Sequence, residues 1–125
     1  MPLRVLIVDD DEVFGKSLET RLRGDDRIEI VGRAVRGTDA LRLTRTLEPD
    51  VVLMDIAMPR MDGLTAARRL RKTCPTVRVV MLTGSDVVAD ENRAREVGAL
   101  YFRKDQIEQL VDELGVEGPR PTAGL

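Results

Sequence analysis

Five side chains that could do metal or phosphoryl chemistry stand at intervals along this chain. Asp9 and Asp10 follow one apolar run, Asp55 ends another, and Thr83 and Lys104 each follow a further run. Carboxylate oxygens are the ligands that Mg²⁺ prefers, so the three acids together would suit that cation. A hydroxyl and an amine suit a phosphoryl group, as hydrogen-bond donor and as positive charge. Because a carboxylate can act as a nucleophile, one acid could carry the phosphoryl group as an aspartyl phosphate.

The segments that would position these side chains alternate between strand and helix. Short apolar runs predict five buried strands, at 3–8, 28–35, 51–54, 77–82 and 99–102. Apolar residues at helical spacing predict five helices between and after them, at about 11–23, 37–48, 62–73, 88–97 and 105–114. This alternation implies a parallel sheet with helices on both faces and right-handed crossovers. The carboxyl ends of parallel strands share one edge, so the candidate side chains should converge there.

The helix starts carry local signals of their own. Asp11 and Glu12 are favourable at the start of the first helix, whose apolar face has Phe14, Leu18 and Leu22 at helical spacing. For Asp9 and Asp10 we prefer a role in the acidic site, because they lie closest to the end of the strand.

Two expectations concern the second half of the chain. Asp105 is predicted to cap the last helix, with Glu108 three residues on as in a capping box. The segment at 88–97 has a thin apolar stripe, and we expect it to pack weakly against the rest of the domain.

The composition excludes several classes of function. With 125 residues and a net charge of −2, the chain fits one globular domain with no basic excess for nucleic-acid binding, and its arginines are interpreted as solvated helix surface. It has no histidine, which removes histidine metal sites and histidine-based nucleophile pairs. Cys74 can form no intrachain disulfide, so a cytoplasmic location is expected. No apolar run is long enough to cross a membrane, and no Gly-rich loop predicts a bound nucleotide or other organic cofactor.

In combination these motifs resemble the response-regulator receiver family, the CheY-like phosphoacceptor domains. The resemblance covers about residues 3–115 through Val8-Asp9-Asp10, Met54-Asp55-Ile56-Ala57-Met58-Pro59 with Asp62-Gly63, Leu82-Thr83-Gly84 and Tyr101-Phe102-Arg103-Lys104. It implies one doubly wound five-stranded parallel sheet of order 2-1-3-4-5, the flavodoxin/CheY-like fold. It also implies a receiver domain at 1–115. Residues 116–125 would be a flexible tail or the start of a linker to an output domain absent from this chain.

The resemblance assigns the acids to a phosphoacceptor and a metal site. Asp55 would be the phosphorylation site. Asp10, Asp55 and the backbone carbonyl of Ala57 would ligate Mg²⁺ directly, while Asp9 would act through water. The resemblance thus implies Mg²⁺ as the cofactor.

It assigns three further residues to holding the phosphoryl group and switching. Lys104 would hold a phosphoryl oxygen, Thr83 would move to bond the phosphoryl group, and Tyr101 would swing inward behind it. The face formed by residues 88–114 would then shift as one unit.

The implied function is signalling rather than enzymatic, although the domain would take part in its own phosphotransfer and autodephosphorylation. The partner would be a histidine kinase or a phosphotransfer protein. The pair Lys104-Asp105 and the run Met-Pro-x-Met-Asp-Gly-Leu look like the NarL/FixJ class, whose receivers usually precede a DNA-binding helix-turn-helix. Transcription is therefore the expected output, and dimerisation on phosphorylation is common in that class.

Two departures and two alternatives stay open. Ala57 and Ser85, two residues past Asp55 and Thr83, occupy positions that modulate dephosphorylation in the family, so the lifetime of the phosphoryl group is undetermined.

A pseudo-receiver would have the same fold and signal by protein contact alone. The complete acidic set argues against it, and Mg²⁺ binding would discriminate. A phosphohydrolase with an aspartyl-phosphate intermediate would need an acid where this chain has Ala57.

Overall fold

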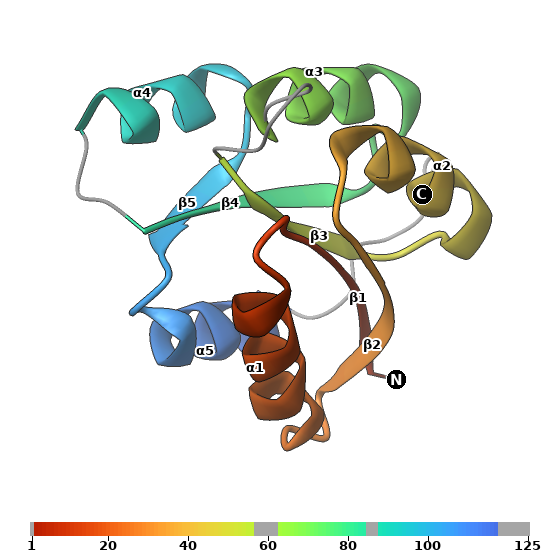
Figure 1. Ribbon diagram of the computed structural model, residues 1–125, viewed down its shortest axis with the longest axis vertical. Coiled ribbons are helices and arrows are strands. Elements are labelled where there is room, and N and C mark those ends of the chain that lie inside the picture. Colours follow the sequence, from red (N-terminus) through yellow and green to blue (C-terminus); the bar gives the residue numbers. More distant parts are fainter. Residues whose placement is uncertain (1, 57–62, 85–87, 118–125) are drawn as a thin grey trace.

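The computed structural model describes residues 2–56, 63–84 and 88–117, in which strands and helices alternate (Figure 1). The elements are β1 (Leu3–Val8), α1 (Glu12–Arg23), β2 (Ile28–Ala34), α2 (Gly37–Leu47), β3 (Val51–Asp55), α3 (Gly63–Thr73), β4 (Arg78–Thr83), α4 (Val88–Glu96), β5 (Leu100–Arg103) and α5 (Ile107–Glu117). The expected alternation is confirmed, with strand bounds within one residue of the predicted ones. None of the helices described is long and apolar enough to cross a membrane.

The strands form one parallel sheet in the order β2-β1-β3-β4-β5, which confirms the predicted fold class. The chain runs outward from β1 to β2, then returns past β1 to add β3, β4 and β5. The order therefore reverses between β1 and β3, and doubly wound sheets bind ligands at the carboxyl ends of the strands where this happens.

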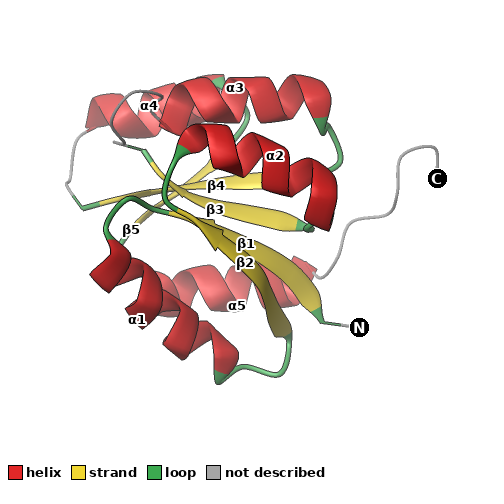
Figure 2. Cartoon of the chain, turned by 45° about the vertical axis from the view of Figure 1, so that its right-hand side comes forward, coloured by secondary structure: helices red, strands yellow, loops and turns green. Residues whose placement is uncertain are grey.

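Helices cover both faces of the sheet, as Figures 1 and 2 show from two directions. α2, α3 and α4 lie on one face, and α1 and α5 lie on the other. Alternate residues of β1 enter different cores: Leu6 and Val8 pack on the α2–α3 side, whereas Val5 and Ile7 pack on the α1–α5 side. Every residue of β3 and β4 is buried, which is why these strands appear in the sequence as continuous apolar runs.

The start of α5 differs from the prediction. The helix begins at Ile107, so its cap position is Gln106, whose carbonyl accepts the N–H of Leu110. The predicted cap at Asp105 is wrong, because that carboxylate pairs with Arg103 while Glu108 pairs with Arg21. The helix also continues to Glu117, three residues beyond its predicted end at 114.

One arginine contradicts the interpretation of these residues as solvated helix surface. Arg78 is the first residue of β4 and is only 3% exposed. Its backbone N–H donates to the carbonyl of Asp50, the residue before β3. Its position in an interior strand, rather than on a helix face, accounts for the burial.

The thin apolar stripe of α4 leaves most of this helix exposed, as expected for a weakly packed element. Among residues 91–96, whose side chains are described, only Ala94 is buried. All four residues of β5 are half-buried, whereas β3 and β4 are fully buried. This end of the domain is therefore less deeply packed than its centre.

Gly63, the first residue of α3, packs closely against the end of β3. A Cβ atom there would collide with the carbonyl oxygen of Asp55 and lie 2.9 Å from Cα of Ile56 and 2.7 Å from Cε of Met81. We expect Gly63→Ala to lower the free energy of unfolding by about 2–3 kcal/mol, measured by urea denaturation. The matched control is Gly84→Ala, because a Cβ at Gly84 meets nothing within 4 Å. Equal stability of the two variants would contradict this packing.

Candidate functional site

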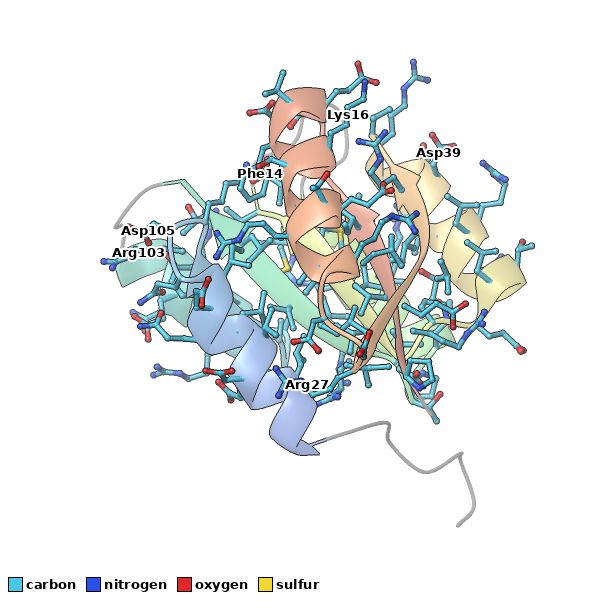
Figure 3. The ribbon with its side chains drawn as sticks, turned by 90° about the horizontal axis from the view of Figure 1, so that it is seen from below. Phe14, Lys16, Arg27, Asp39, Arg103 and Asp105 are labelled. Atoms are coloured by element: carbon cyan, nitrogen blue, oxygen red, sulfur yellow. The ribbon has the colours of Figure 1, made fainter. Side chains whose placement is uncertain are left out.

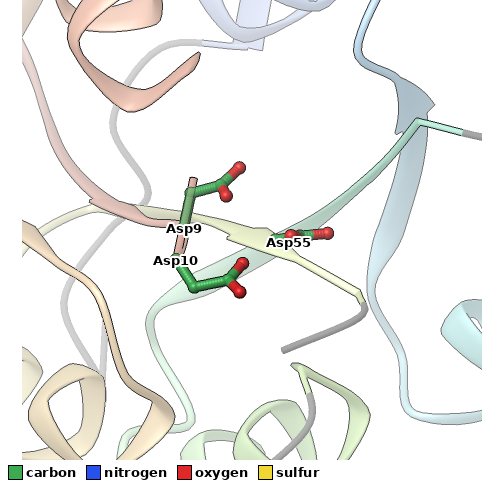
Figure 4. A group of neighbouring side chains, drawn as sticks. All are labelled: Asp9, Asp10 and Asp55. Atoms are coloured by element: carbon green, nitrogen blue, oxygen red, sulfur yellow. The ribbon is translucent and has the colours of Figure 1, made fainter. Parts of the chain in front are cut away.

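Three carboxylates gather at the carboxyl ends of β1 and β3 (Figure 4). Asp9, Asp10 and Asp55 each offer one oxygen, and these oxygens lie within 4.8 Å of one another. Asp9 is 4% exposed and Asp55 7%, whereas Asp10 is exposed. The acids therefore converge where two of them are shielded from water, and like charges placed so close repel one another.

The register of the sheet explains this convergence. Val8 pairs with Met54. The residues that come next in the chain, Asp9 after β1 and Asp55 at the end of β3, therefore lie side by side. Asp55 in turn pairs with Leu82, which places Thr83 one residue beyond it on the neighbouring strand.

Lys104 reaches the same edge from the far end of the sheet. Thr83 pairs with Arg103, and the backbone N–H of Lys104 donates to the carbonyl of Thr83 at 2.7 Å. The ammonium Nζ lies 2.9 Å from Oδ2 of Asp9 and 3.7 Å from Oδ2 of Asp55. The only ammonium in this cluster of described side chains is thus shared between two of the acids.

The surroundings of Lys104 keep it charged. Its burial alone would lower the pKa of the ammonium, but the carboxylate of Asp9, followed by that of Asp55, opposes this effect. The net result is a pKa for Lys104 above its ordinary value of 10.5. The ammonium therefore stays protonated throughout the physiological pH range.

The donor set fits a hard divalent cation. Oδ1 of Asp9 accepts the backbone N–H of Asp11 at 2.8 Å, but its buried Oδ2 accepts no aligned hydrogen bond from the described residues and only forms the ion pair with Lys104. Three carboxylates facing one ammonium leave an excess of two negative charges. Clustered carboxylate oxygens with excess negative charge are suitable ligands for Mg²⁺.

The two predicted switch residues lie on neighbouring strands. Thr83 ends β4 and is 3% exposed, and Tyr101 lies on β5 opposite Met81, where its half-buried ring packs against the core on the α2–α3 side. Thr83 therefore shares the edge with the acids, whereas Tyr101 lies further down the sheet. Ala57 and Ser85, which the sequence also singled out, are outside the described residues.

Sequence reasoning missed the contribution of one residue to this site. Phe14 was expected only as part of the apolar face of the first helix. In the structure its ring lies beside Lys104, with 4.4 Å between the ring centroid and Nζ. The helical spacing of Phe14, Leu18 and Leu22 does not distinguish a core ring from one that contacts an ammonium 90 residues away.

The fold and the site together define a doubly wound α/β domain with an acidic cluster at its switch point. Comparison with known families identifies it further, because residues 5–114 match the response regulator receiver domain. The chain belongs to this family, whose members are the receivers of two-component systems.

Two relatives are each matched over only part of their length. The chain is 37% identical over 114 residues to protein-glutamate methylesterase/protein-glutamine glutaminase 2 of Photobacterium profundum, covering 88% of this chain and 28% of that protein. It is also 37% identical over 114 residues to the response regulator GacA of Pseudomonas aeruginosa, covering 90% of this chain and 53% of that protein. The chain therefore spans about half the length of these relatives or less.

A solved structure agrees with the family assignment. The signal receiver domain of the response regulator NarL from Mycobacterium tuberculosis superposes with a TM-score of 0.84 at 30% sequence identity. The match covers 92% of this chain and 97% of that chain.

The shared ammonium predicts a stability effect. Lys104→Met keeps most of the side-chain stem but removes the charge between Asp9 and Asp55. Without divalent cations, we expect the free energy of unfolding to fall by about 1–3 kcal/mol. Mg²⁺ should reduce this loss by supplying positive charge in its place. Chemical denaturation with EDTA or with Mg²⁺ measures both effects, and Lys72→Met, at an exposed position on α3, is the control.

The pH dependence of this effect follows from the raised pKa. A group whose pKa is higher in the folded state stabilises the fold below its unfolded pKa and loses that contribution as the pH rises through the folded value. The difference between wild type and Lys104→Met should therefore be constant from about pH 7 to 9 and shrink only above 10.5. A variant as stable as wild type in EDTA would contradict the role of Lys104 as counter-charge.

Proposed function

We propose that this receiver domain accepts a phosphoryl group on Asp55 from a phosphohistidine of a histidine kinase or phosphotransfer protein. The observation that carries the proposal is the position of Asp55, at the end of a buried central strand and 3.7 Å from the ammonium of Lys104. A carboxylate oxygen of Asp55 forms the new bond to phosphorus as the bond to the imidazole nitrogen breaks. The imidazole keeps the bonding electron pair and takes up a proton.

The neighbouring acids are less suited to be the acceptor. Both oxygens of Asp9 are engaged, one by the backbone N–H of Asp11 and the other by Lys104. Asp10 is exposed, so its carboxylate is solvated rather than partly desolvated. Asp55 is the member of the cluster on the central strand β3, flanked by Thr83 on one side and Asp9 on the other.

The acidic cluster would hold Mg²⁺ through Asp10 and Asp55, with Asp9 acting through water. The backbone carbonyl of Ala57 stays a predicted ligand, outside the described residues. When bound, Mg²⁺ supplies positive charge between the carboxylates and the phosphoryl oxygens. Lys104 contributes a second positive charge by holding another phosphoryl oxygen.

Phosphorylation would then act on the less deeply packed end of the domain. The hydroxyl of Thr83 would turn to bond the phosphoryl group, and Tyr101 would move into the space that Thr83 leaves. The shallow burial of β5 and of residues 91–96 in α4 supports a shift of the 88–114 face as one unit. Such an element responds only by as much as the phosphoryl group interacts differently with its two arrangements.

The output belongs to a part of the protein outside this chain. The NarL/FixJ-like motifs favour transcription through a DNA-binding domain joined after residues 116–125, with dimerisation on phosphorylation. One relative is named a response regulator and the other a methylesterase, so similarity to this receiver does not by itself indicate the output. The second candidate is the pseudo-receiver, a cytoplasmic protein-interaction module that is not phosphorylated.

Intact mass spectrometry tests the acceptor. With Mg²⁺ and acetyl phosphate, we expect one phosphoryl adduct on wild type and none on Asp55→Asn. Asp39→Asn, which alters a carboxylate on α2, should react like wild type, and EDTA should prevent the adduct. An adduct on Asp55→Asn at the wild-type rate would refute the assignment. No adduct and no Mg²⁺ binding by wild type would favour the pseudo-receiver.

Lys104 should matter more to the switch than to the acceptance of the phosphoryl group. Lys104→Ala keeps Asp55 and the acidic cluster, so we expect it still to accept the phosphoryl group, but more slowly than wild type. Amide chemical-shift changes over residues 88–114 on phosphorylation should be smaller than in wild type, because one contact to the phosphoryl group is lost. Shift changes of full size in a fully phosphorylated Lys104→Ala sample would show that the switch does not use Lys104.

A further inference from the structure

Phe14 closes one side of the space around the Lys104 ammonium. The ring centroid is 4.4 Å from Nζ, while Asp9 lies at 2.9 Å and Asp55 at 3.7 Å. Figure 3 shows Phe14 on α1, on the side of the helix toward Arg103, which ends β5, and Asp105, which follows that strand. The ammonium is thus confined by two carboxylates and one aromatic ring.

Both partners of this contact are anchored through their backbones. The N–H of Phe14 donates to Oδ1 of Asp11, the side chain that caps α1, at 3.1 Å. The N–H of Lys104 donates to the carbonyl of Thr83 at the end of β4. The start of α1 and the end of the sheet therefore place the ring and the ammonium independently of each other.

We propose that Phe14 is a positioning residue for phosphotransfer, holding the Lys104 ammonium where it meets an oxygen of the phosphoryl group on Asp55. This inference rests on the proposed phosphorylation of Asp55. A lysine stem is flexible, and restricting it has an entropic cost that a fixed neighbour reduces. The ring face attracts the cation through its quadrupole and also excludes water from that side.

The chemistry of the ring suits this role better than that of a polar neighbour. A third carboxylate beside the ammonium would take up an N–H group and compete with the phosphoryl oxygen. An aromatic face accepts only weakly, so the N–H group directed toward Asp55 stays available when that side chain becomes phosphorylated. The ring therefore restrains the ammonium without occupying its donors.

The rate of adduct formation from acetyl phosphate with Mg²⁺ tests this role without involving a kinase. We expect Phe14→Leu, which keeps an apolar side chain but removes the ring, to react about three- to tenfold more slowly. Phe14→Tyr keeps the ring and should stay within about twofold of wild type. Val13→Ala is the matched control, because Val13 lies in the same helical turn but is 80% exposed.

A double-mutant cycle separates positioning from general packing. Phe14 also packs against the core between the sheet and α1, so its loss could act through the fold. If the ring acts through the ammonium, Phe14→Leu should cause no further loss of rate in a Lys104→Met background. If Phe14→Leu slows the reaction by the same factor in the wild-type and in the Lys104→Met background, the proposal is overturned.

Nuclear magnetic resonance of the free protein provides a readout independent of phosphorylation. The ring current of Phe14 should shift the ε-methylene protons of Lys104 upfield in wild type and in Phe14→Tyr, but not in Phe14→Leu. Unshifted protons in wild type would overturn the contact itself. If wild type forms no adduct, the proposed acceptor function fails; if wild type reacts but the cycle is additive, only the role of Phe14 fails.

Discussion

The main electrostatic constraint on this structure is the repulsion among three carboxylates at one edge of the sheet. Asp9 and Asp55 are almost fully buried, where negative charge is poorly solvated, and Asp10 lies beside them. Positive charge within a few ångströms offsets this repulsion, and Lys104 supplies one such charge. The remaining excess of negative charge is what suits the edge to a divalent cation. The phosphotransfer that we propose depends on that incomplete neutralisation.

The sheet makes this arrangement possible because its central strands are buried on both faces. β3 and β4 are buried throughout, and their register with β1 and β5 brings the end of each strand to the same edge. A slip of one residue would turn the apolar side chains of a strand to the opposite face, so the packed cores also fix the position of the acids. The half-buried β5 and the sparsely buried α4 contrast with this centre. This contrast between a deeply buried centre and a less deeply packed flank suits the conformational response that we propose.

Lys104 connects the parts of the domain that would take part in the proposed response. Its ammonium contacts acids that follow β1 and end β3 and lies beside a ring of α1, and its backbone N–H is hydrogen-bonded to the end of β4. A phosphoryl group on Asp55 would compete with Asp9 for the same ammonium. A local change of charge would therefore alter contacts on several elements at once. The chain is similar to relatives that are named for different activities, a response regulator and a methylesterase.

The sequence by itself determined the fold and the identity of the candidate site residues. Continuous apolar runs ending in Asp9, Asp55 and Thr83 were sufficient to predict buried parallel strands with polar residues at a common edge, since local patterning specifies strands and helices directly. Only the tertiary structure decided contacts between segments distant in sequence. These contacts are the 2.9 Å approach of Lys104 to Asp9 and the ring of Phe14 beside the ammonium. The burial of Arg78 also became known only from the tertiary structure. The cap at Asp105 was mispredicted for a local reason: its carboxylate pairs with Arg103, two residues earlier, and spacing alone could not decide between that partner and the helix. Periodicity reports which face of an element is apolar, whereas the partner that meets that face depends on how all the elements pack.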